Sequence, residues 1–272
     1  TLSKKKCDFS GVRLLSDTQK MLRNFISPYT PYNGILIYHG VGVGKTCTSI
    51  TIAEGLKEVI KNNKKKIYVL VNPSIKENFK NEILDKGLIE KNITEAMKGC
   101  TGDFYFRDGV LQKGLDKKKN MKLVIRNVLN DYYEFYGYNE FASKVMSIIG
   151  NVKRKSDKKN LQNNIKKKLK EYFSDSMIII DEAHNISKKD RDSADVAFSE
   201  IEESFNEMDN GIDNDKSNGD KVGRVTIQVL KNILINSDNL KLLLLTATPM
   251  YNQAYEIIDL INLLLLNDNR SI

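Results

Sequence analysis

The chain has 272 residues, 40% of them hydrophobic and 29% charged, which is enough for one full-sized globular domain with a substantial core. The formal net charge of +8 suits a polyanionic partner without requiring one, because the lysines fall in short runs that are typical of solvated surface. The three cysteines, at positions 7, 47 and 100, offer no disulfide framework and no apolar run approaches the roughly 20 residues that cross a bilayer, so we expect a cytoplasmic protein without a membrane partner.

Four predicted strands alternate with helical patterns along the chain. The strands are apolar runs at 34–38, 66–72, 177–181 and 240–249, and helical patterns cover 46–61, 73–84 and 251–266. This alternation predicts an α/β fold with a mostly parallel sheet and helices on both faces. Two segments depart from it: the Lys- and Tyr-rich residues 106–172 predict a helical insertion, and the polar residues 188–222 a flexible loop.

A glycine-rich stretch, HGVGVGKT, lies between the first strand and the first long helix. It differs from the P-loop pattern G-x-x-x-x-G-K-[ST] only in that His39 replaces the first glycine. Gly42 and Gly44 allow successive N–H groups to turn toward an anion, and a helix N-terminus favours negative charge. We therefore expect Lys45 to contact the β- and γ-phosphates of ATP and Thr46 to ligate Mg²⁺. The alternative, a glycine turn with a coincidental lysine, is disfavoured by the position between strand and helix.

An acidic pair follows the third predicted strand, in the sequence MIIIDEAH. That strand brings Asp181 to the carboxyl edge of the sheet, where ligands of open α/β sheets bind. Asp181 is expected to hold Mg²⁺ through water, and Glu182 to orient and polarise the attacking water. The four residues DEAH could instead begin a surface helix or belong to a metal site of another kind. The preceding strand and the P-loop favour ATP hydrolysis.

Together these motifs resemble superfamily 2 helicases and translocases. HGVGVGKT, DEAH and LLTATP resemble motifs I, II and III in their usual order, VLVNPSIKENFKNEI resembles motif Ia, and CTGDFY resembles motif Ib more weakly. The stretch from 18 to 47, with IIIDEAHNIS and LLTATPMYN, is most similar to helicase-type ATPases of large nucleocytoplasmic DNA viruses, including early-transcription-factor and transcription-termination ATPases. The resemblance covers most of 14–105 and 172–266 and implies a RecA-like P-loop NTPase lobe that uses ATP and Mg²⁺.

The resemblance also implies roles for individual residues. His184 would join Lys45, Asp181 and Glu182 in catalysis by linking the nucleotide site to motif III. The implied nucleotide-binding set is Gln19, Gly40, Val41, Gly42, Val43, Gly44, Lys45, Thr46 and Cys47. The implied coupling residues are Thr246, Ala247 and Thr248, and the implied nucleic-acid contacts are Asn72, Pro73, Ser74 and Thr101. The side chain of Cys47 and the aromatic cluster at 132–138 are assigned to packing rather than to base stacking.

Superfamily 2 motors use two RecA-like lobes, and the second supplies arginine fingers. After Pro249 the only arginine is Arg270, so we expect residues 1–272 to form a single lobe that lacks the second one and hydrolyses ATP slowly by itself. The expected partners are nucleic acid, DNA in preference to RNA, the second lobe, and RNA polymerase or transcription factors in a host cytoplasm, viral factory or virion. The alternatives are another P-loop ATPase, such as a clamp loader or partition ATPase, and a nucleotide-dependent nucleic-acid-binding module without motor activity.

Overall fold

The structure is a computed structural model that describes part of the chain. The described residues are 15–38, 40, 44–91, 99–101, 105, 121–153, 160–186, 217–250 and 255–270. The predicted nucleotide contacts at 41–43 and most of the predicted loop, residues 188–216, lie outside these ranges.

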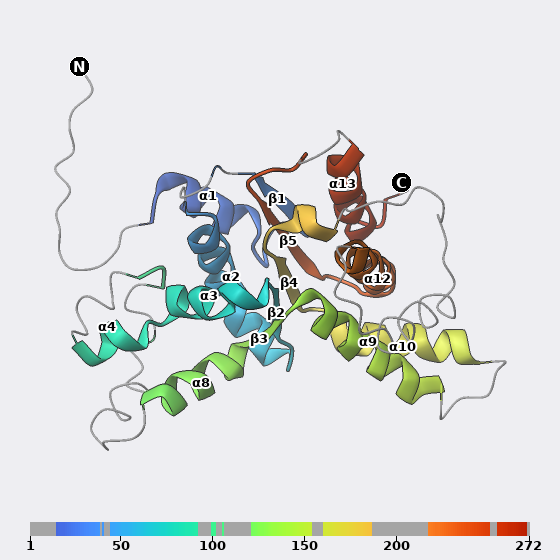
Figure 1. Ribbon diagram of the computed structural model, residues 1–272, viewed down its shortest axis with the longest axis horizontal. Coiled ribbons are helices and arrows are strands. Elements are labelled where there is room, and N and C mark those ends of the chain that lie inside the picture. Colours follow the sequence, from blue (N-terminus) through green and yellow to red (C-terminus); the bar gives the residue numbers. More distant parts are fainter. Residues whose placement is uncertain are drawn as a thin grey trace.

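A five-stranded sheet forms the centre of the molecule (Figure 1). Its strands are β1 (Gly34–Tyr38), β2 (Ile67–Leu70), β3 (Tyr133–Tyr136), β4 (Met177–Ile180) and β5 (Lys241–Thr246). They are arranged in the order β1-β5-β4-β2-β3, and every neighbouring pair is parallel. The predicted α/β fold with a mostly parallel sheet is therefore confirmed.

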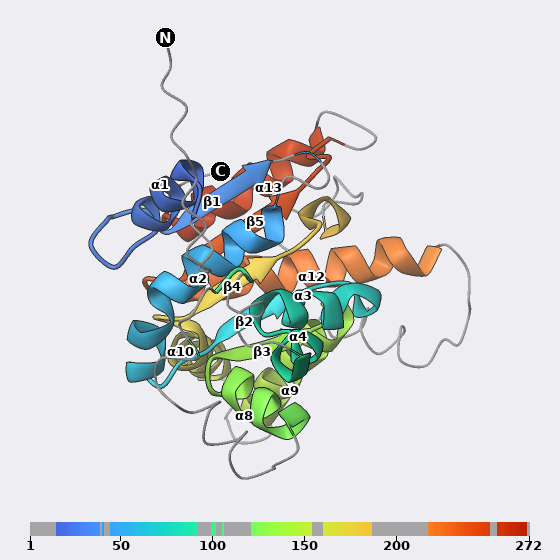
Figure 2. The ribbon, with the colours of Figure 1, turned by 90° about the vertical axis from the view of Figure 1, so that its left-hand side faces the viewer.

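Helices cover both faces of this sheet, as Figure 1 and the perpendicular view in Figure 2 show. One face carries α1 (Asp17–Phe25), α2 (Lys45–Asn62), α3 (Lys76–Ile83), α4 (Lys86–Lys91) and α8 (Met121–Tyr132). The other carries α9 (Tyr138–Lys153), α10 (Leu161–Phe173), α12 (Ser217–Asn236) and α13 (Tyr255–Asn267). Two short 3-10 helices, η1 (Pro73–Ile75) and η2 (Ala183–Ile186), follow β2 and β4.

The sheet divides the interior into two cores because successive strand residues point to opposite faces. In β2, Ile67 and Val69 join the core under α1, α2 and α3, whereas Tyr68 and Leu70 join the core under α9, α10 and α12. Strands buried on both faces become continuous apolar runs, as β4 is. This is why β2, β4 and β5 could be recognised in the sequence, whereas β1, a partly exposed edge strand, was recognised by its aliphatic residues.

Two elements differ from the sequence-based expectations. β3 and three helices, α8, α9 and α10, occupy the described part of 106–172, and the strand pairs in parallel with β2. Its sequence, YEFY, has three aromatic residues and a glutamate and none of the Ile, Leu or Val residues that dominate the other strands. Residues 217–222, predicted as the end of a loop, form the first turns of α12.

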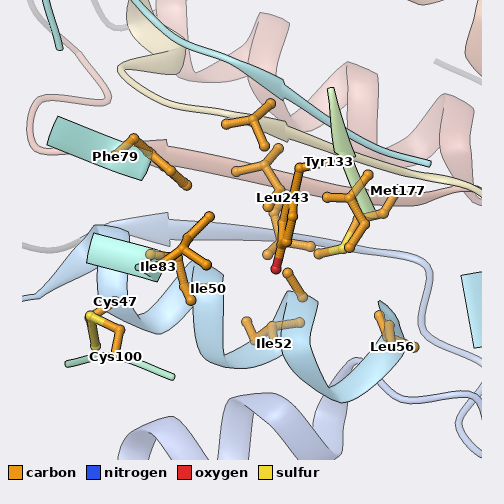
Figure 3. Close-up of a cluster of buried hydrophobic side chains, with 14 of the residues drawn as sticks. Cys47, Ile50, Ile52, Leu56, Phe79, Ile83, Cys100, Tyr133, Met177 and Leu243 are labelled. Carbon is orange, nitrogen blue, oxygen red and sulfur yellow. A yellow bond between two sulfur atoms is a disulfide. The ribbon is translucent and has the colours of Figure 1, made fainter. Parts of the chain in front are cut away.

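A disulfide joins Cys47, in the first turn of α2, to Cys100, and the two Cα atoms are 5.2 Å apart. Both residues are only 4% exposed and lie at the margin of the core under α2 and α3 (Figure 3). The expectation that the cysteines form no disulfide is therefore wrong. The sequence separation of 53 between the two cysteines hides the pairing, because only the tertiary fold brings them together. The cysteine pattern consequently gives no support for the expected cytoplasmic location.

Candidate functional site

The carboxyl ends of three adjacent strands, β1, β5 and β4, meet at one edge of the sheet. Tyr38 at the end of β1 pairs with Thr246 at the end of β5, and Ile180 at the end of β4 pairs with Leu244. Ligands of parallel α/β sheets bind outside such an edge. The loop that leads into α2 and the acidic residues after β4 both begin here.

The helix α2 begins directly at the predicted phosphate-binding lysine. Gly44 precedes it with φ of 84°, a left-handed conformation that side-chain-bearing residues rarely adopt. A Cβ at this position would meet nothing within 4 Å, so the backbone conformation, rather than lack of space, favours glycine. The first N–H groups of this 18-residue helix have no partner within the helix and favour an anion.

The structure brings Lys45 and Glu182 together. Lys45 Nζ lies 3.9 Å from Glu182 Oε1, and the side chains are 10% and 34% exposed. The ammonium group is thus shielded, while the carboxylate keeps access to solvent. The first turn of α2 and the turn after β4 form one polar site.

Asp181 and Glu182 form a tight turn after β4. Asp181 is buried, and its N–H donates to the carbonyl of Leu70 at 3.0 Å. The N–H of Glu182 donates to Asp181 Oδ1 at 3.0 Å, and Glu182 has φ of 47°. Burial raises the pKa of the Asp181 carboxyl above its usual value, and the negative charge of Glu182 raises the pKa further. A divalent cation would relieve this repulsion, so the acidic pair fits a metal ion.

His184 connects this turn to the end of β5. Its Nδ1 lies 3.3 Å from Glu182 Oε2 and 3.0 Å from Thr246 Oγ1. Thr248 Oγ1 is 3.4 Å from the same nitrogen, and the Thr248 N–H donates to Thr246 Oγ1 at 3.1 Å. A continuous polar chain therefore runs from Lys45 through Glu182 and His184 to the two threonines that flank Ala247.

Thr46 follows Lys45 on α2 and is partly buried, and Gly40 is exposed just beyond β1. Hydroxyl and carboxylate oxygens are suitable ligands for Mg²⁺, which usually takes one or two protein side chains together with phosphate oxygens. Thr46 and Asp181 are the residues that would hold such an ion. Together with the start of α2, they fit a metal–nucleotide complex.

Gln19 lies on α1, which packs beside α2 (Figure 2). It is buried, and its Oε1 accepts a hydrogen bond from the Ser16 N–H at 3.0 Å, while the Gln19 N–H donates to Ser16 Oγ. This reciprocal pair is a capping box at the start of α1. One side-chain oxygen is therefore already engaged, and contact of Gln19 with a nucleotide stays a prediction.

The predicted nucleic-acid contacts lie at the two ends of α3. Asn72 precedes η1, where its Oδ1 accepts from both the N–H and the hydroxyl of Ser74, with Pro73 between them. Thr101 donates its hydroxyl to the carbonyl of Ile83, the last residue of α3. The polar groups of the two motifs thus stabilise the beginning and the end of one helix.

Two side chains near the site make contacts that the sequence does not reveal. Cys47 turns into the core and its disulfide, so only its backbone could face a nucleotide. Tyr138, assigned to packing with the other aromatic residues, donates its hydroxyl hydrogen to the carbonyl oxygen of Asp181. Sequence reasoning missed this contact because a backbone carbonyl leaves no signal in the sequence.

Comparison with known proteins gives a consistent family. Residues 12–251 match the family described as "Type III restriction enzyme, res subunit" (ResIII). Two relatives from Acanthamoeba polyphaga mimivirus are "Putative ATP-dependent RNA helicase L377", 32% identical over 95% of this chain and 19% of the relative, and "Putative ATP-dependent RNA helicase R563", 28% identical over 92% and 32%. "Putative helicase 087L" of Invertebrate iridescent virus 3 is 30% identical over 91% of this chain and 20% of the relative. The chain thus spans between about a fifth and a third of the length of these relatives.

The sequence predicts no segment long and apolar enough to cross a bilayer, and the helices of the structure bear on this point. Among the described residues, no helix combines the length and the apolar character that a membrane span requires.

Proposed function

The chain belongs to the ResIII family of superfamily 2 helicase-like ATPase domains, and on that basis we propose that it is the ATP-binding lobe of a nucleic-acid-dependent ATPase. In this proposal, hydrolysis of ATP drives movement along DNA or RNA. The observation that supports it best is the polar chain from Lys45 through Glu182 and His184 to Thr246. It joins a helix start suited to phosphate, an acidic pair suited to metal and the end of a neighbouring strand.

The proposed roles follow from charge and position. Lys45 would exchange its carboxylate neighbour, Glu182 at 3.9 Å, for the β- and γ-phosphates of ATP. Glu182, released from the ammonium group and partly exposed, would then accept a proton from the attacking water. Thr46 and Asp181 would hold Mg²⁺, which, when bound, neutralises the charge that develops on the phosphates.

His184 is proposed to transmit the state of the site. Its Nδ1 atom contacts both Glu182 and Thr246. A change in the position of Glu182 would therefore alter the hydrogen bonding of the segment after β5. In a motor, this segment would pass the change to the nucleic-acid track or to a second lobe.

The nucleic acid along which the protein would move is proposed from the chemistry of phosphate contacts and from the names of the relatives. The ends of α3 present polar groups suited to backbone phosphates, which carry no sequence information. The names of the two mimivirus relatives specify RNA, whereas the sequence motifs alone led us to expect DNA, so both nucleic acids belong in the test. The resemblance of the motifs to viral early-transcription-factor and transcription-termination ATPases motivates the proposal that the protein works with RNA polymerase or transcription factors.

The decisive experiment measures ATP turnover by the full-length protein with single-stranded DNA, duplex DNA, RNA or no nucleic acid, with Lys45→Ala as the control. We expect stimulation by one of these nucleic acids and loss of turnover in the variant. The same measurement on residues 1–272 should give ATP binding with slow turnover, since an arginine finger contributes about 10³–10⁵ in rate. Nucleotide-dependent binding of nucleic acid without turnover by the full-length protein would instead identify a binding module.

A further inference from the structure

The peptide unit between Asp181 and Glu182 is held from both sides. On one side its N–H donates to Asp181 Oδ1 at 3.0 Å. On the other side its carbonyl oxygen accepts the hydroxyl hydrogen of Tyr138. A peptide unit is planar, so fixing its N–H and its C=O together fixes the rotation of the whole unit. The two contacts therefore determine how the chain enters Glu182.

The conformation that follows needs such support. Glu182 has φ of 47°, in the left-handed region that residues with a Cβ disfavour. This conformation directs the carboxylate to a position where Oε1 is 3.9 Å from Lys45 Nζ and Oε2 is 3.3 Å from His184 Nδ1. Residues held in sparsely populated backbone conformations persist only where their surroundings determine them.

Tyr138 is itself firmly placed. It begins α9, which packs against α12 (Figure 1), and its carbonyl accepts a hydrogen bond from Thr226 Oγ1 at 3.5 Å.

We propose that Tyr138 is a positioning residue for Glu182: by holding the Asp181 carbonyl, it fixes the turn that aims the catalytic carboxylate. This inference rests on the proposed function, because it assigns Glu182 to the attack of water. It goes beyond the motifs, since Tyr138 comes from a different part of the chain and touches neither nucleotide nor metal in the proposed mechanism.

A purely structural role for the same hydroxyl has different consequences. If the hydrogen bond only satisfied a buried carbonyl, its loss would lower the melting temperature and leave kcat for the folded protein unchanged. If it orients Glu182, its loss lowers kcat and leaves the KM for ATP unchanged, since Lys45 and Thr46 keep their places. A split between kcat and KM therefore separates the two roles.

The test uses Tyr138→Phe in the full-length protein, with Tyr136→Phe as the matched control. The Tyr136 hydroxyl donates to Glu134 on the same strand, β3, which β2 separates from β4 and the turn that follows it. We expect Tyr138→Phe to lower kcat about tenfold, a fraction of the 10²–10⁴ that a general base contributes, with KM within about twofold. Tyr136→Phe should leave both constants unchanged. In a Glu182→Gln background, measured by single turnover, Tyr138→Phe should have no further effect.

A kcat within about twofold of the parent protein, an equal loss in Tyr136→Phe, or an undiminished effect in the Glu182→Gln background would each overturn the inference. Amide hydrogen exchange supplies a readout that does not need turnover. Peptides spanning 177–186 should exchange faster in Tyr138→Phe than in Tyr136→Phe, and equal exchange would refute the positioning role. If Lys45→Ala and Glu182→Gln leave turnover unchanged, the proposed function fails, and the exchange result still decides whether Tyr138 holds the turn.

Discussion

Glu182 occupies the centre of the polar site, between an ammonium group and an imidazole. Its amide analogue keeps the size and most of the hydrogen-bonding capacity of the side chain but cannot accept a proton from water. We expect Glu182→Gln to lower kcat by about 10²–10⁴ because the general base is lost. ATP binding should be retained or strengthened, since one negative charge near the phosphates is removed.

Steady-state turnover and equilibrium binding of ATP, measured on the same preparation, check this expectation. Exposed Glu77→Gln, in the first turn of α3, serves as a control for loss of a carboxylate elsewhere. Unchanged turnover in Glu182→Gln would assign proton transfer to another group.

Asp181 illustrates a conflict between stability and activity. Its pKa is raised in the folded protein, first by burial and then by the charge of Glu182. Above this raised pKa the ionised carboxylate costs stability, and below the pKa of the unfolded chain the cost is absent. Asp181→Asn should therefore raise the melting temperature at neutral pH and abolish Mg²⁺-dependent turnover, and Asn Oδ1 can still accept from the Glu182 N–H.

Thermal unfolding of the nucleotide-free variant and parent protein across a pH series tests whether Asp181→Asn raises or lowers the melting temperature. The advantage of Asp181→Asn should shrink as the pH falls through the raised pKa of Asp181 and vanish below the unfolded value. The exposed pair of Asp238 and Lys170 offers a control, because Asp238→Asn should change stability by less than about 1 kcal/mol. A lower melting temperature for Asp181→Asn at neutral pH would contradict the argument.

At the scale of this site, the motifs and the family resemblance that they carry predicted which residues meet. The structure brings Lys45 close to Glu182 and His184 close to Thr246, in agreement with the motif order. Tyr138 could not be predicted, since its partner is a main-chain oxygen and aromatic residues in a cluster usually pack. The left-handed conformation of Glu182 was equally hidden, because nothing in a Glu side chain favours it.

Among the elements, α2 is anchored by a buried ionic cluster on the side away from the site. Lys57 is fully buried and forms an ion pair with Glu54. The hydroxyls of Tyr105 and Tyr133 donate to Glu54 Oε1 at 2.8 and 2.6 Å, and Lys57 Nζ lies 3.7 Å from the centre of the Tyr105 ring. Burial, and then the charge of Glu54, raise the pKa of both phenols, so they remain donors.

Because a buried cation depends on its carboxylate partner, Glu54→Leu should destabilise the fold by about 3–5 kcal/mol. Glu58→Leu is the matched control one turn later: exposed Glu58 accepts only from the partly exposed Tyr132 in the contacts described and should cost about 1 kcal/mol or less. Urea denaturation with a constant m-value would measure both. A loss for Glu54→Leu no larger than that for Glu58→Leu would show that the cluster does not anchor the helix.

The elements also show where sequence patterns fail. Strands β1, β2, β4 and β5 were predicted because each is a run of Ile, Leu, Val or Met, and β2, β4 and β5 are also buried on both faces. β3 is an edge strand, as β1 is, but its sequence YEFY lacks aliphatic residues, so it was attributed to an insertion. The start of α12 is polar, and polar residues with a glycine are compatible with both a loop and a helix end. An aliphatic run thus reveals a strand at the edge of the sheet as well as inside it, whereas an aromatic strand such as β3 is missed.

For the molecule as a whole, the disulfide is a strong constraint. It closes a loop of 53 residues, and the loss of chain entropy in the unfolded state corresponds to about 4 kcal/mol of stabilisation. Reduction, or Cys100→Ser, should lower the melting temperature by on the order of 10 °C. Differential scanning calorimetry with and without reductant measures this effect, and the parent treated with reductant should match Cys100→Ser.

Cys7→Ser is the control, since this residue lies outside the described part of the chain and outside the bond. It should leave the melting temperature and its response to reductant unchanged. A reductant-insensitive parent protein would show that the bond does not contribute to the stability of the fold in solution.

Strand β5 lies between β1 and β4 and is hydrogen-bonded to both along its length. To slide, it would have to break two ladders at once, and residues 242–245 are fully enclosed on both faces. The backbone of β5 is therefore held in place, and only its carboxyl end is adjustable, because the hydroxyl of Thr246 can exchange hydrogen-bond partners there. A change at the acidic turn after β4 would therefore reach the segment after β5 through exchange of the hydrogen bonds of Thr246. The backbone of the sheet can keep its position while these bonds change.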